Sequence, residues 1–349
     1  MVSDQRVVNI DGSIGEGGGQ VLRTSLALAV LTGKAFRMTN IRRRRSKPGL
    51  MPQHLKAVEA ASAVGMAHVS GDRFGSQELV FEPTGIRGGQ FHFDIGTAGS
   101  TSLALQTIVY PLSFADADSS LTLVGGTHVP WSPCFHYLQL HWLLYMRKLG
   151  FEIRLELESA GFYPRGGGRV QAAVHAVTKL FPINLTKRGS LKRIRGISAV
   201  ANLSSEVAER QRRQALYRLG ELASAAEFDV LSLMAPSPGT FLLLLAEFEN
   251  SQCCFVGLGA RGKPAERVAD EAVKELRNFL STDGSVDYYL ADQLVVPMAL
   301  ASGESEVRSS RITQHLATNA EVVKIFLPVS IEIDAAVGQA GSIRIKPGT

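Results

Sequence analysis

The chain has 349 residues, 45% of them hydrophobic and 20% charged, and its formal net charge is +5. This composition is ordinary for a globular protein with a sizeable core, and no apolar run is long enough to cross a bilayer. The three cysteines have no zinc-like spacing, and the polar start lacks the apolar region of a signal peptide. We therefore expect a cytoplasmic protein with no membrane partner.

The first predicted helix follows a glycine-rich loop, in "IGEGGGQVLRTSLALAV" at residues 14–30. Three consecutive glycines let backbone N–H groups and the positive end of the helix dipole approach an anion, although the loop also suits a simple tight turn. Glu16 is either a carboxylate favoured by that dipole or a ligand for a metal or a general base. Arg23 is either a surface cation or, within this apolar helix, a cation that needs an anionic partner.

A basic run follows, "IRRRRSKPG" at residues 41–49, with five cations in six positions. This run is either a solvated basic loop or a phosphate-binding loop, and its sequence alone does not distinguish the two interpretations. His54 comes next, at the start of a second predicted helix. It is either a polar residue of the first turn or a hydrogen-bond donor to an anion.

The chain repeats itself. "TSLALAVLTG" at residues 24–33 and "TSLALQTIVY" at 101–110 share their first five letters, and "ADQLVVPMALAS" at 291–302 is a looser copy preceded by the strand-like "SVDYYL". A helix, a glycine stop and a strand also recur, at residues 54–71 and 135–159. These patterns predict an α/β protein built from α+β repeats of about two helices and a small sheet, each too small to fold alone.

The pattern changes from about residue 187. A strand begins at "RIRGISAVANL", a long helix covers residues 204–225, three further strands lie near 228–233, 240–249 and 253–258, and a helix follows Pro264. We predict a smaller inserted α+β domain at residues 187–283. The repeated core domain would then consist of residues 1–186 and 284–349.

The eight histidines differ in their surroundings. His315, in "RITQHLATNA", is by itself best interpreted as a histidine at the edge of the core, and His128 lies in a turn and stays ambiguous. Five others are predicted on helix or strand surfaces and are assigned no chemistry: His68, His92, His136, His141 and His175. Two familiar nucleotide motifs fail, because "GARGKP" is not a Walker loop and "GEGGGQ" lacks the context of a dinucleotide fingerprint.

Seven stretches together resemble the RNA 3′-terminal phosphate cyclase family. They are "GEGGGQVLRTSL", "IRRRRSKPGLMPQHL", "GTAGSTSLALQT", "GGTHVPWSP", "GFYPRGGG", "YYLADQLVVPMAL" and "TQHLATN", in this order along almost the whole chain. The resemblance implies a large domain of three repeated units like the C-terminal domain of translation initiation factor three, with a smaller inserted domain. It also implies an ATP-dependent conversion of an RNA 3′-phosphate to a 2′,3′-cyclic phosphate through a covalent histidine–AMP intermediate and an RNA-adenylate. No obligate protein partner is indicated.

The same resemblance assigns roles to residues of the chain. It implies that His315 is the nucleophile, which attacks the α-phosphorus of ATP and releases pyrophosphate. Arg23, Arg42 and His54 align with positions that hold phosphates, including the RNA end. Glu16 matches a carboxylate that holds Mg²⁺ or Mn²⁺ on ATP, which is a normal ligand set for magnesium when phosphates supply the rest.

The nucleotide itself is assigned four further residues by the resemblance. Tyr289 and Pro133 match the two walls around adenine, Asp292 matches the ribose contact, and Gln106 matches another polar contact to the nucleotide. The chain departs from the family pattern at His128 and His136, where acids are expected, and at Cys134, where proline is common. A role of those acids in metal or substrate contact is therefore in doubt for this chain.

Three other functions were weighed. A non-catalytic relative that works in ribosome assembly would lack the nucleophilic histidine, whereas "TQHLATN" retains His315. An enolpyruvyl transferase on a similar repeated fold is allowed by fold alone, but it would not need the adenine-site residues. A pure RNA-binding module is disfavoured because only 7% of the residues are aromatic.

Overall fold

The computed structural model describes residues 7–348, which form four mixed sheets of four strands each with helices packed against them. The expected mixed α/β class is thereby confirmed. Residues 1–6 of the polar start lie outside the described residues. Within the described part of the chain, no helix combines the length and the apolar character that a bilayer crossing requires.

The first unit has the order βαβαββ. Its elements are β1 (Val8–Asp11), α1 (Gly19–Thr32), β2 (Phe36–Thr39), α2 (Pro52–Gly65), β3 (His68–Ser70) and β4 (Leu79–Glu82). The strands lie in the order β1-β2-β4-β3. Strands β1 and β2 are parallel, and the other two pairings are antiparallel. Helix α1 thus supplies the crossover that a parallel pair requires.

The second unit repeats this topology. Its elements are β5 (Gly89–Asp94), α3 (Thr101–Leu112), β6 (Ser119–Gly125), a continuous helical segment made of α4 (Phe135–Tyr137), a π-helical turn (Leu138–Trp142) and α5 (Leu143–Leu149), and then β7 (Glu152–Ser159) and β8 (Gly168–His175). The strand order is β5-β6-β8-β7, again with one parallel pair, β5 with β6.

The third unit repeats the topology once more, but its first strand is separated from the rest by a long insertion. Its elements are β9 (Asn184–Leu185), α8 (Tyr288–Ala299), β14 (Ser305–Ser309), α9 (Gln314–Phe326), β15 (Val329–Ile333) and β16 (Gly341–Pro347). Strand β9 pairs parallel with β14, and the sheet order is β9-β14-β16-β15. The predicted threefold repeat is therefore visible in the strand order, whereas the likeness to initiation factor three stays a prediction.

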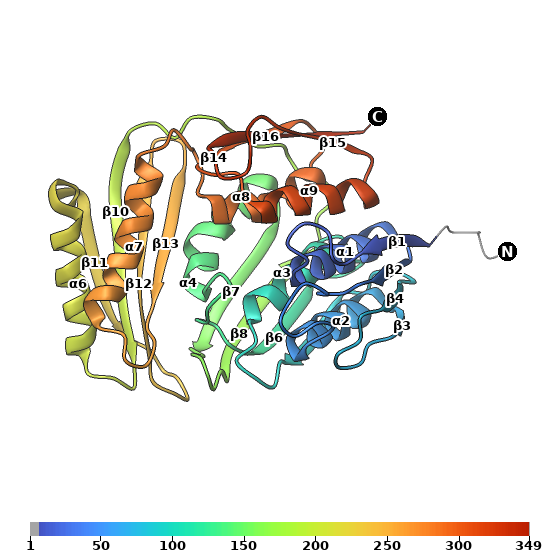
Figure 1. Cartoon of the computed structure of the whole chain (residues 1–349), viewed down its shortest axis with the longest axis horizontal. Helices are drawn as coiled ribbons and strands as arrows, with labels where there is room; N and C mark the ends of the chain where they lie inside the picture. Colours follow the sequence, from blue (N-terminus) through green and yellow to red (C-terminus); the bar gives the residue numbers. More distant parts are fainter. Residues whose placement is uncertain (1–6, 349) are drawn as a thin grey trace.

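The insertion forms the fourth sheet. It contains β10 (Leu191–Ala201), α6 (Ser205–Leu219), a 3₁₀ turn (Gly220–Ala225), β11 (Ala226–Ser232), β12 (Gly239–Phe248), β13 (Gln252–Leu258) and α7 (Ala265–Leu280). The sheet and its two helices lie at the end of the molecule opposite β1–β4 (Figure 1). The predicted domain boundaries at 187 and 283 are close to its limits and stay a prediction.

Strand β12 is buried on both faces. Leu242 and Leu244 belong to the apolar cluster formed with α6 and α7, whereas Phe241, Leu243 and Leu245 belong to the main core. The unbroken apolar run of this strand follows from that double burial. The inserted sheet is therefore joined to the rest of the protein by apolar packing as well as by the chain.

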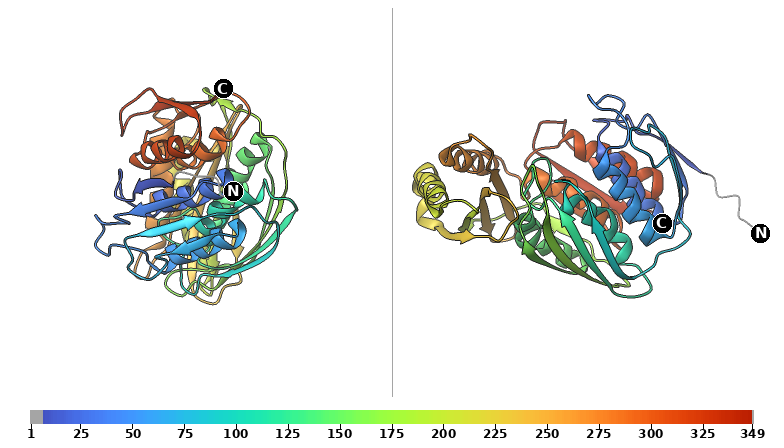
Figure 2. Two further views of the ribbon diagram at one scale, coloured as in Figure 1. Left: turned by 90° about the vertical axis from the view of Figure 1, so that its right-hand side faces the viewer. Right: turned by 90° about the horizontal axis from the view of Figure 1, so that it is seen from below.

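The helices of the three units meet in the middle of the molecule. Helix α1 contacts α2, α3 and α9, and α9 also contacts α8, as the two further views show (Figure 2). Helix α1 is buried continuously from Leu26 to Val30. A helix that is apolar nearly all round is stable only when other elements cover it on several sides. The units therefore bury each other's helices.

One predicted element is wrong. The segment "SVDYYL" was expected to form a strand, but α8 already begins at Tyr288. The cause is Asp287, whose side-chain carboxylate accepts a hydrogen bond of 2.9 Å from the Leu290 backbone N–H and caps the helix. The aromatic pair Tyr288 and Tyr289, which suggested a strand, is the first turn of the helix.

Candidate functional site

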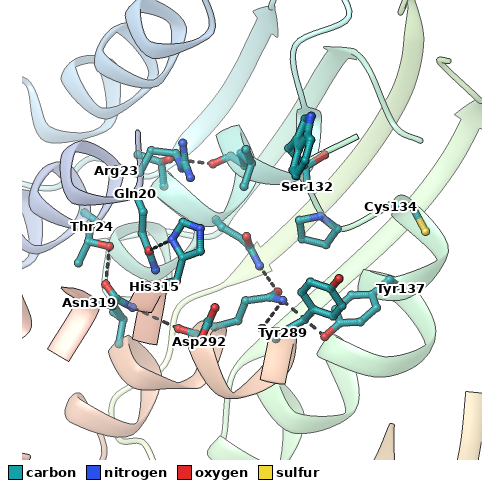
Figure 3. A pocket seen from close by; sticks show the side chains of 18 of the residues that line it. Gln20, Arg23, Thr24, Ser132, Cys134, Tyr137, Tyr289, Asp292, His315 and Asn319 are labelled. Atoms are coloured by element: carbon teal, nitrogen blue, oxygen red, sulfur yellow. Dashed lines mark hydrogen bonds between the residues drawn. The ribbon is translucent and has the colours of Figure 1, made fainter. Parts of the chain in front are cut away.

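A pocket of about 520 Å³ lies where the central helices converge. Its wall is formed by α1, α3, α8 and α9, by the loop before α4 and by strand β13 of the inserted sheet. Six of the residues assigned a role from the sequence lie in this wall, namely Arg23, Gln106, Pro133, Tyr289, Asp292 and His315. Figure 3 labels four of them, Arg23, Tyr289, Asp292 and His315. The pocket therefore collects residues from opposite ends of the chain, from Gln20 to Asn319.

His315 is held at the N-terminus of α9 between two side chains. Its Nδ1 lies 2.7 Å from Oε1 of Gln20 on α1, and its Nε2 lies 3.0 Å from a carboxylate oxygen of Glu16. Because an amide oxygen only accepts, Nδ1 donates to Gln20, and Nε2 faces the Glu16 carboxylate. Desolvation lowers the pKa of His315, with Arg23 and Arg45 acting in the same direction and Glu16 opposing them. The imidazole is therefore neutral near pH 7.

The glycine loop lets a cation, Arg23, and a neutral imidazole, His54, approach each other. A Cβ atom at Gly19 would lie 2.5 Å from Nε2 of His54 and 2.9 Å from Nη1 of Arg23. At Gly18 the nearest atom is the flexible end of Arg45, at 3.1 Å. Gly17 has a positive φ of 56°, so its restriction comes from backbone conformation. Of these three glycines, only Gly19 has to be small for Arg23 and His54 to come together.

His54 presents a hydrogen-bond donor to this region. Its Nδ1 accepts a hydrogen bond of 3.1 Å from the Met51 backbone N–H, so the ring proton of the neutral imidazole is on Nε2. Burial, aided by the charges of Arg23 and Arg42, lowers the pKa of His54 to about 3. The sequence left two interpretations of His54 open, and an Nε2–H donor that is free within the described part of the chain is what the anion-donor interpretation requires.

Arg23 has no ion-pair partner among residues 7–348. It lies half-buried on α1, one turn after Gly19, and desolvation lowers its pKa to about 10, so it stays charged at neutral pH. An arginine charge in a partly desolvated pocket is unfavourable without an anion. The anionic partner that the sequence analysis required is therefore not supplied by the described protein.

The basic loop uses its arginines in different ways. Nη1 of Arg42 donates to the backbone carbonyls of Lys47 and Gly49, at 2.8 and 2.9 Å, and so holds the loop closed. Arg45, which the sequence analysis did not single out, lies 3.5 Å from the Glu16 carboxylate. Arg43, Arg44 and Arg45 are exposed. Only Arg45 therefore connects the loop directly to the neighbourhood of His315.

The opposite part of the pocket is lined by Tyr289, Pro133 and polar side chains of α3 and α8. Gln106 donates a hydrogen bond of 2.6 Å to Gln293, whose own amide donates to the Tyr289 carbonyl at 2.9 Å. Asp292 accepts a hydrogen bond of 2.5 Å from Thr313. Desolvation raises the pKa of Asp292 to about 8, so that its carboxyl group can donate as well as accept near neutral pH.

A buried carboxylate anchors the helix that carries Tyr289 and Asp292. Besides capping α8, Asp287 accepts hydrogen bonds from His141 Nε2 at 2.7 Å and from the Tyr137 hydroxyl at 3.2 Å. The amide of Gln252, on β13, lies 3.2 Å from Nδ1 of His141. Asp287 thus fixes α8 to the second unit, and His141 continues the connection to the inserted sheet.

Two histidines predicted on surfaces are buried instead. His141 belongs to the Asp287 network, and His136 lies with its Nδ1 2.8 Å from Nε2 of His128. The ring of His128 stacks on Phe241 of the inserted sheet with a centroid distance of 4.6 Å. Burial lowers the pKa of His136 to about 4, so this pair is uncharged and acts as packing. The prediction failed because the inserted sheet covers this face.

Several pocket residues were missed. Gln20 and Asn319 lie one turn before Thr24 and one turn after His315, so helical spacing could have indicated them. Gln293 follows Asp292 directly. No sequence signal indicates the apolar wall of Cys254, Val256 and Leu258, because only the packing of the inserted sheet places these residues at the pocket.

Comparison with known proteins gives one consistent result. A sequence model of the family described as "RNA 3'-terminal phosphate cyclase" matches residues 14–333. Curated proteins named "RNA 3'-terminal phosphate cyclase" are similar over nearly the whole chain. The protein of Nostoc punctiforme is 41% identical, over 95% of this chain and 97% of its own length, and that of Archaeoglobus fulgidus is 43% identical, over 92% and 96%. The protein of Pseudomonas fluorescens is 44% identical, over 94% of both chains.

Among solved structures, the EPSP synthase of Acinetobacter baumannii matches with 12% identity and a TM-score of 0.27, over 93% of this chain and 62% of that one. A TM-score this low does not indicate a shared fold.

The Gly19 contacts predict an effect on anion binding. Gly19→Ala should displace the Arg23 guanidinium and the His54 ring, because its Cβ would occupy their space. Loss of hydrogen bonds to a charged group weakens binding by about 1.5–3 kcal/mol, so the affinity for inorganic pyrophosphate, measured by calorimetry, should fall roughly tenfold or more. Gly18→Ala is the matched control and should bind pyrophosphate nearly as tightly as the unchanged protein. Equal losses in both variants would contradict this account.

The Asp287 network predicts a stability effect. Asp287→Asn should lower the free energy of unfolding by about 3 kcal/mol, because one partner of a buried charged network is lost. Urea titration followed by circular dichroism measures this change. Asp283→Asn, which removes an exposed carboxylate paired with Arg308, should cost about 1 kcal/mol at most. A loss for Asp287→Asn as small as that of the control would show that the network does not stabilise α8.

Proposed function

The chain belongs to the RNA 3′-terminal phosphate cyclase family, and we propose that it uses ATP to convert an RNA 3′-phosphate to a 2′,3′-cyclic phosphate. Its relatives over more than nine tenths of the chain carry the name of this enzyme. The observation that carries the proposal is a neutral histidine, His315, in the same pocket as Arg23, a cation without an anionic partner in the described protein.

His315 is the nucleophile of the proposed first step. Its Nε2 forms a bond to the α-phosphorus of ATP while the bond to pyrophosphate breaks. The hydrogen bond from Nδ1 to Gln20 supports this role, because it keeps the proton of a neutral imidazole on Nδ1 once Nε2 turns from Glu16 to the phosphorus. The lowered pKa of His315 supports it as well, since an imidazolium has no lone pair to offer.

Two further transfers complete the reaction. An oxygen of the RNA 3′-phosphate displaces His315 from the adenylyl phosphorus, which gives an RNA-adenylate. The neighbouring 2′-hydroxyl then loses its proton and attacks the activated 3′-phosphorus, and AMP leaves. Negative charge increases on phosphate oxygens in each step, so the main contribution expected from the protein is electrostatic. Arg23 and His54 are placed to give it, and Arg42 contributes charge to the same region while holding its loop.

The adenine and ribose contacts form the second part of the proposal. Tyr289 and Pro133 line one pocket, and an aromatic face with a proline ring is suited to enclose a planar base. Asp292, with a pKa of about 8, can donate to and accept from a ribose hydroxyl. Gln106 and its partner Gln293 offer amide groups beside them.

The described residues fit a magnesium or manganese ion only in part. No group of three histidine, cysteine, aspartate or glutamate side chains able to hold a metal ion is present in residues 7–348. Glu16 is a single half-buried carboxylate beside His315, which suits an ion whose remaining ligands are phosphate oxygens and water. Glu16 is therefore the residue that would hold such an ion on the triphosphate, where the ion would neutralise phosphate charge.

The non-catalytic assembly-factor alternative is disfavoured by the surroundings of His315. A histidine that only completes the edge of the core does not need Glu16, Gln20 and the charge of Arg23 around it. The pocket of about 520 Å³ is also within the size range of small-molecule sites.

The first test is the mass of the intact protein after incubation with ATP and Mg²⁺ or Mn²⁺. The unchanged protein should gain one acid-labile adenylyl group, because the P–N bond to histidine breaks in acid. RNA with a 3′-phosphate should then remove the group and yield a cyclic phosphate end. His315→Ala should gain nothing. His92→Ala, which changes an exposed histidine on β5, is the control and should be adenylylated normally.

An absence of any adduct on the folded unchanged protein, with either metal, would contradict the proposal and favour the assembly-factor alternative.

The electrostatics of His315 predict a pH effect. The rate of self-adenylylation should fall as the pH decreases through the pKa of His315, which lies below its ordinary value of 6.5. Arg45 helps to lower that pKa, so Arg45→Gln should raise it and move the acid limb of the rate profile to higher pH. Arg44→Gln, in the same loop but not among the charges acting on His315, should leave the limb in place. A shift to lower pH in Arg45→Gln would be inconsistent with this account.

A further inference from the structure

Two exposed aromatic side chains stand on adjoining loops beside the pocket. Trp131 is 98% exposed and Tyr163 is 70% exposed. Their loops are joined by a parallel bridge between His128 and Phe162, and the backbone N–H of His128 donates to the Gly161 carbonyl at 3.0 Å. We call these two hydrogen-bonded loops the rim, and neither the adenine contacts nor the phosphate contacts account for its exposed rings.

The backbone holds the Trp131 indole outward. Trp131 has a left-handed φ of 64°, which costs a bulky residue about 1–2 kcal/mol. The residues before it are firmly anchored, since Thr127, His128 and Val129 are all buried, and the Ser132 hydroxyl donates to the Val129 carbonyl at 3.2 Å. The other tryptophan of the chain, Trp142, is fully buried. A strained turn that exposes a large apolar ring is unfavourable unless the ring has a partner.

The position of Trp131 indicates the chemistry of that partner. Trp131 lines the same pocket as Arg23 and His315, and it precedes Ser132, which lies at the edge of the pocket in Figure 3. Arg165, on the Tyr163 loop, is exposed and fixed by a hydrogen bond from Nη1 to the Pro236 carbonyl at 2.8 Å, which leaves its charge available. Aromatic faces next to cations are the combination that binds single-stranded nucleic acid.

We propose that Trp131 stacks on a base of the RNA substrate near its 3′ end, with Tyr163 and Arg165 continuing the contact to the adjacent nucleotide. This inference rests on the proposed function, because binding of the RNA 3′-phosphate by Arg23 and His54 is what brings the last bases of the RNA to this rim. Stacking depends on the face of the base and not on its hydrogen-bonding groups, so the contact favours RNA ends whose bases are unpaired and tolerates different sequences.

The two tryptophans of the chain make the contact directly measurable. In His315→Ala, which cannot become adenylylated, a single-stranded oligoribonucleotide with a 3′-phosphate should quench the emission of Trp131 and protect it from acrylamide. In His315→Ala combined with Trp131→Leu, only buried Trp142 remains, and the oligoribonucleotide should leave its emission unchanged. This titration needs neither ATP nor turnover, so it gives an answer even when the proposed catalytic function fails.

Steady-state kinetics give the second readout. Trp131→Ala should raise the KM for RNA roughly tenfold, as expected for the loss of one stacked base, and Trp131→Phe should restore most of the affinity. The change should fall on the KM for RNA and not on the KM for ATP in self-adenylylation. A KM for RNA that stays unchanged in Trp131→Ala, or Trp131 emission that the oligoribonucleotide does not affect, would overturn the proposal. Quenching by ATP alone, with a raised KM for ATP, would also overturn it by assigning Trp131 to the nucleotide.

Discussion

The mutual burial of the central helices is the constraint on which the rest of this structure depends. Helix α1 belongs to the first unit and helices α8 and α9 to the third, and each is too apolar to face water. The few polar groups they carry inward must therefore satisfy one another or a ligand. The Thr24 hydroxyl donates to Asn319 at 2.7 Å, and the Asn319 amide donates to the carbonyl of Asp292 at 3.2 Å. This chain of hydrogen bonds joins α1 to α9 and α9 to α8 at the pocket.

Two polar groups without a partner among the described residues, the Arg23 guanidinium and the Nε2–H of His54, are the ones proposed to act on phosphate. Arg23 and the Nε2–H of His54 lie together only because Gly19 has no side chain. Bringing a charge into a partly desolvated pocket lowers stability, as the lowered pKa values of Arg23 and His54 indicate. The same desolvation strengthens the interaction of these groups with an incoming anion and keeps His315 neutral. Stability and function are thus opposed at this site. The folding free energy that is lost by desolvating the charge is offset by burial of the large apolar core.

The inserted sheet contributes to the pocket as well as to the core. Strand β13 supplies the apolar wall of Cys254, Val256 and Leu258. The contact with the second unit is uncharged where His128 stacks on Phe241, whereas the contact around Asp287 is polar and fully hydrogen-bonded. At His128 and His136, the two positions where the resemblance led us to expect acids, this chain has a neutral buried pair. The substitution suits burial, because a neutral imidazole is much less costly to desolvate than a carboxylate.

The sequence by itself determined the α/β class, the threefold repeat and the candidate catalytic and binding residues. These follow from glycine stops, helical periodicity and the segment "TQHLATN", which are local signals. It left Arg23 open between a surface cation and a cation that needs an anion, and an arginine in an apolar helix is unfavourable without one. Only the tertiary structure decided that Gly19 is the glycine that has to be small, that Arg42 holds its own loop, that His136 and His141 are buried, and that Asp287 begins a helix. Each of these depends on which segments meet in space, and contacts between residues far apart in the chain leave no periodic pattern in the sequence.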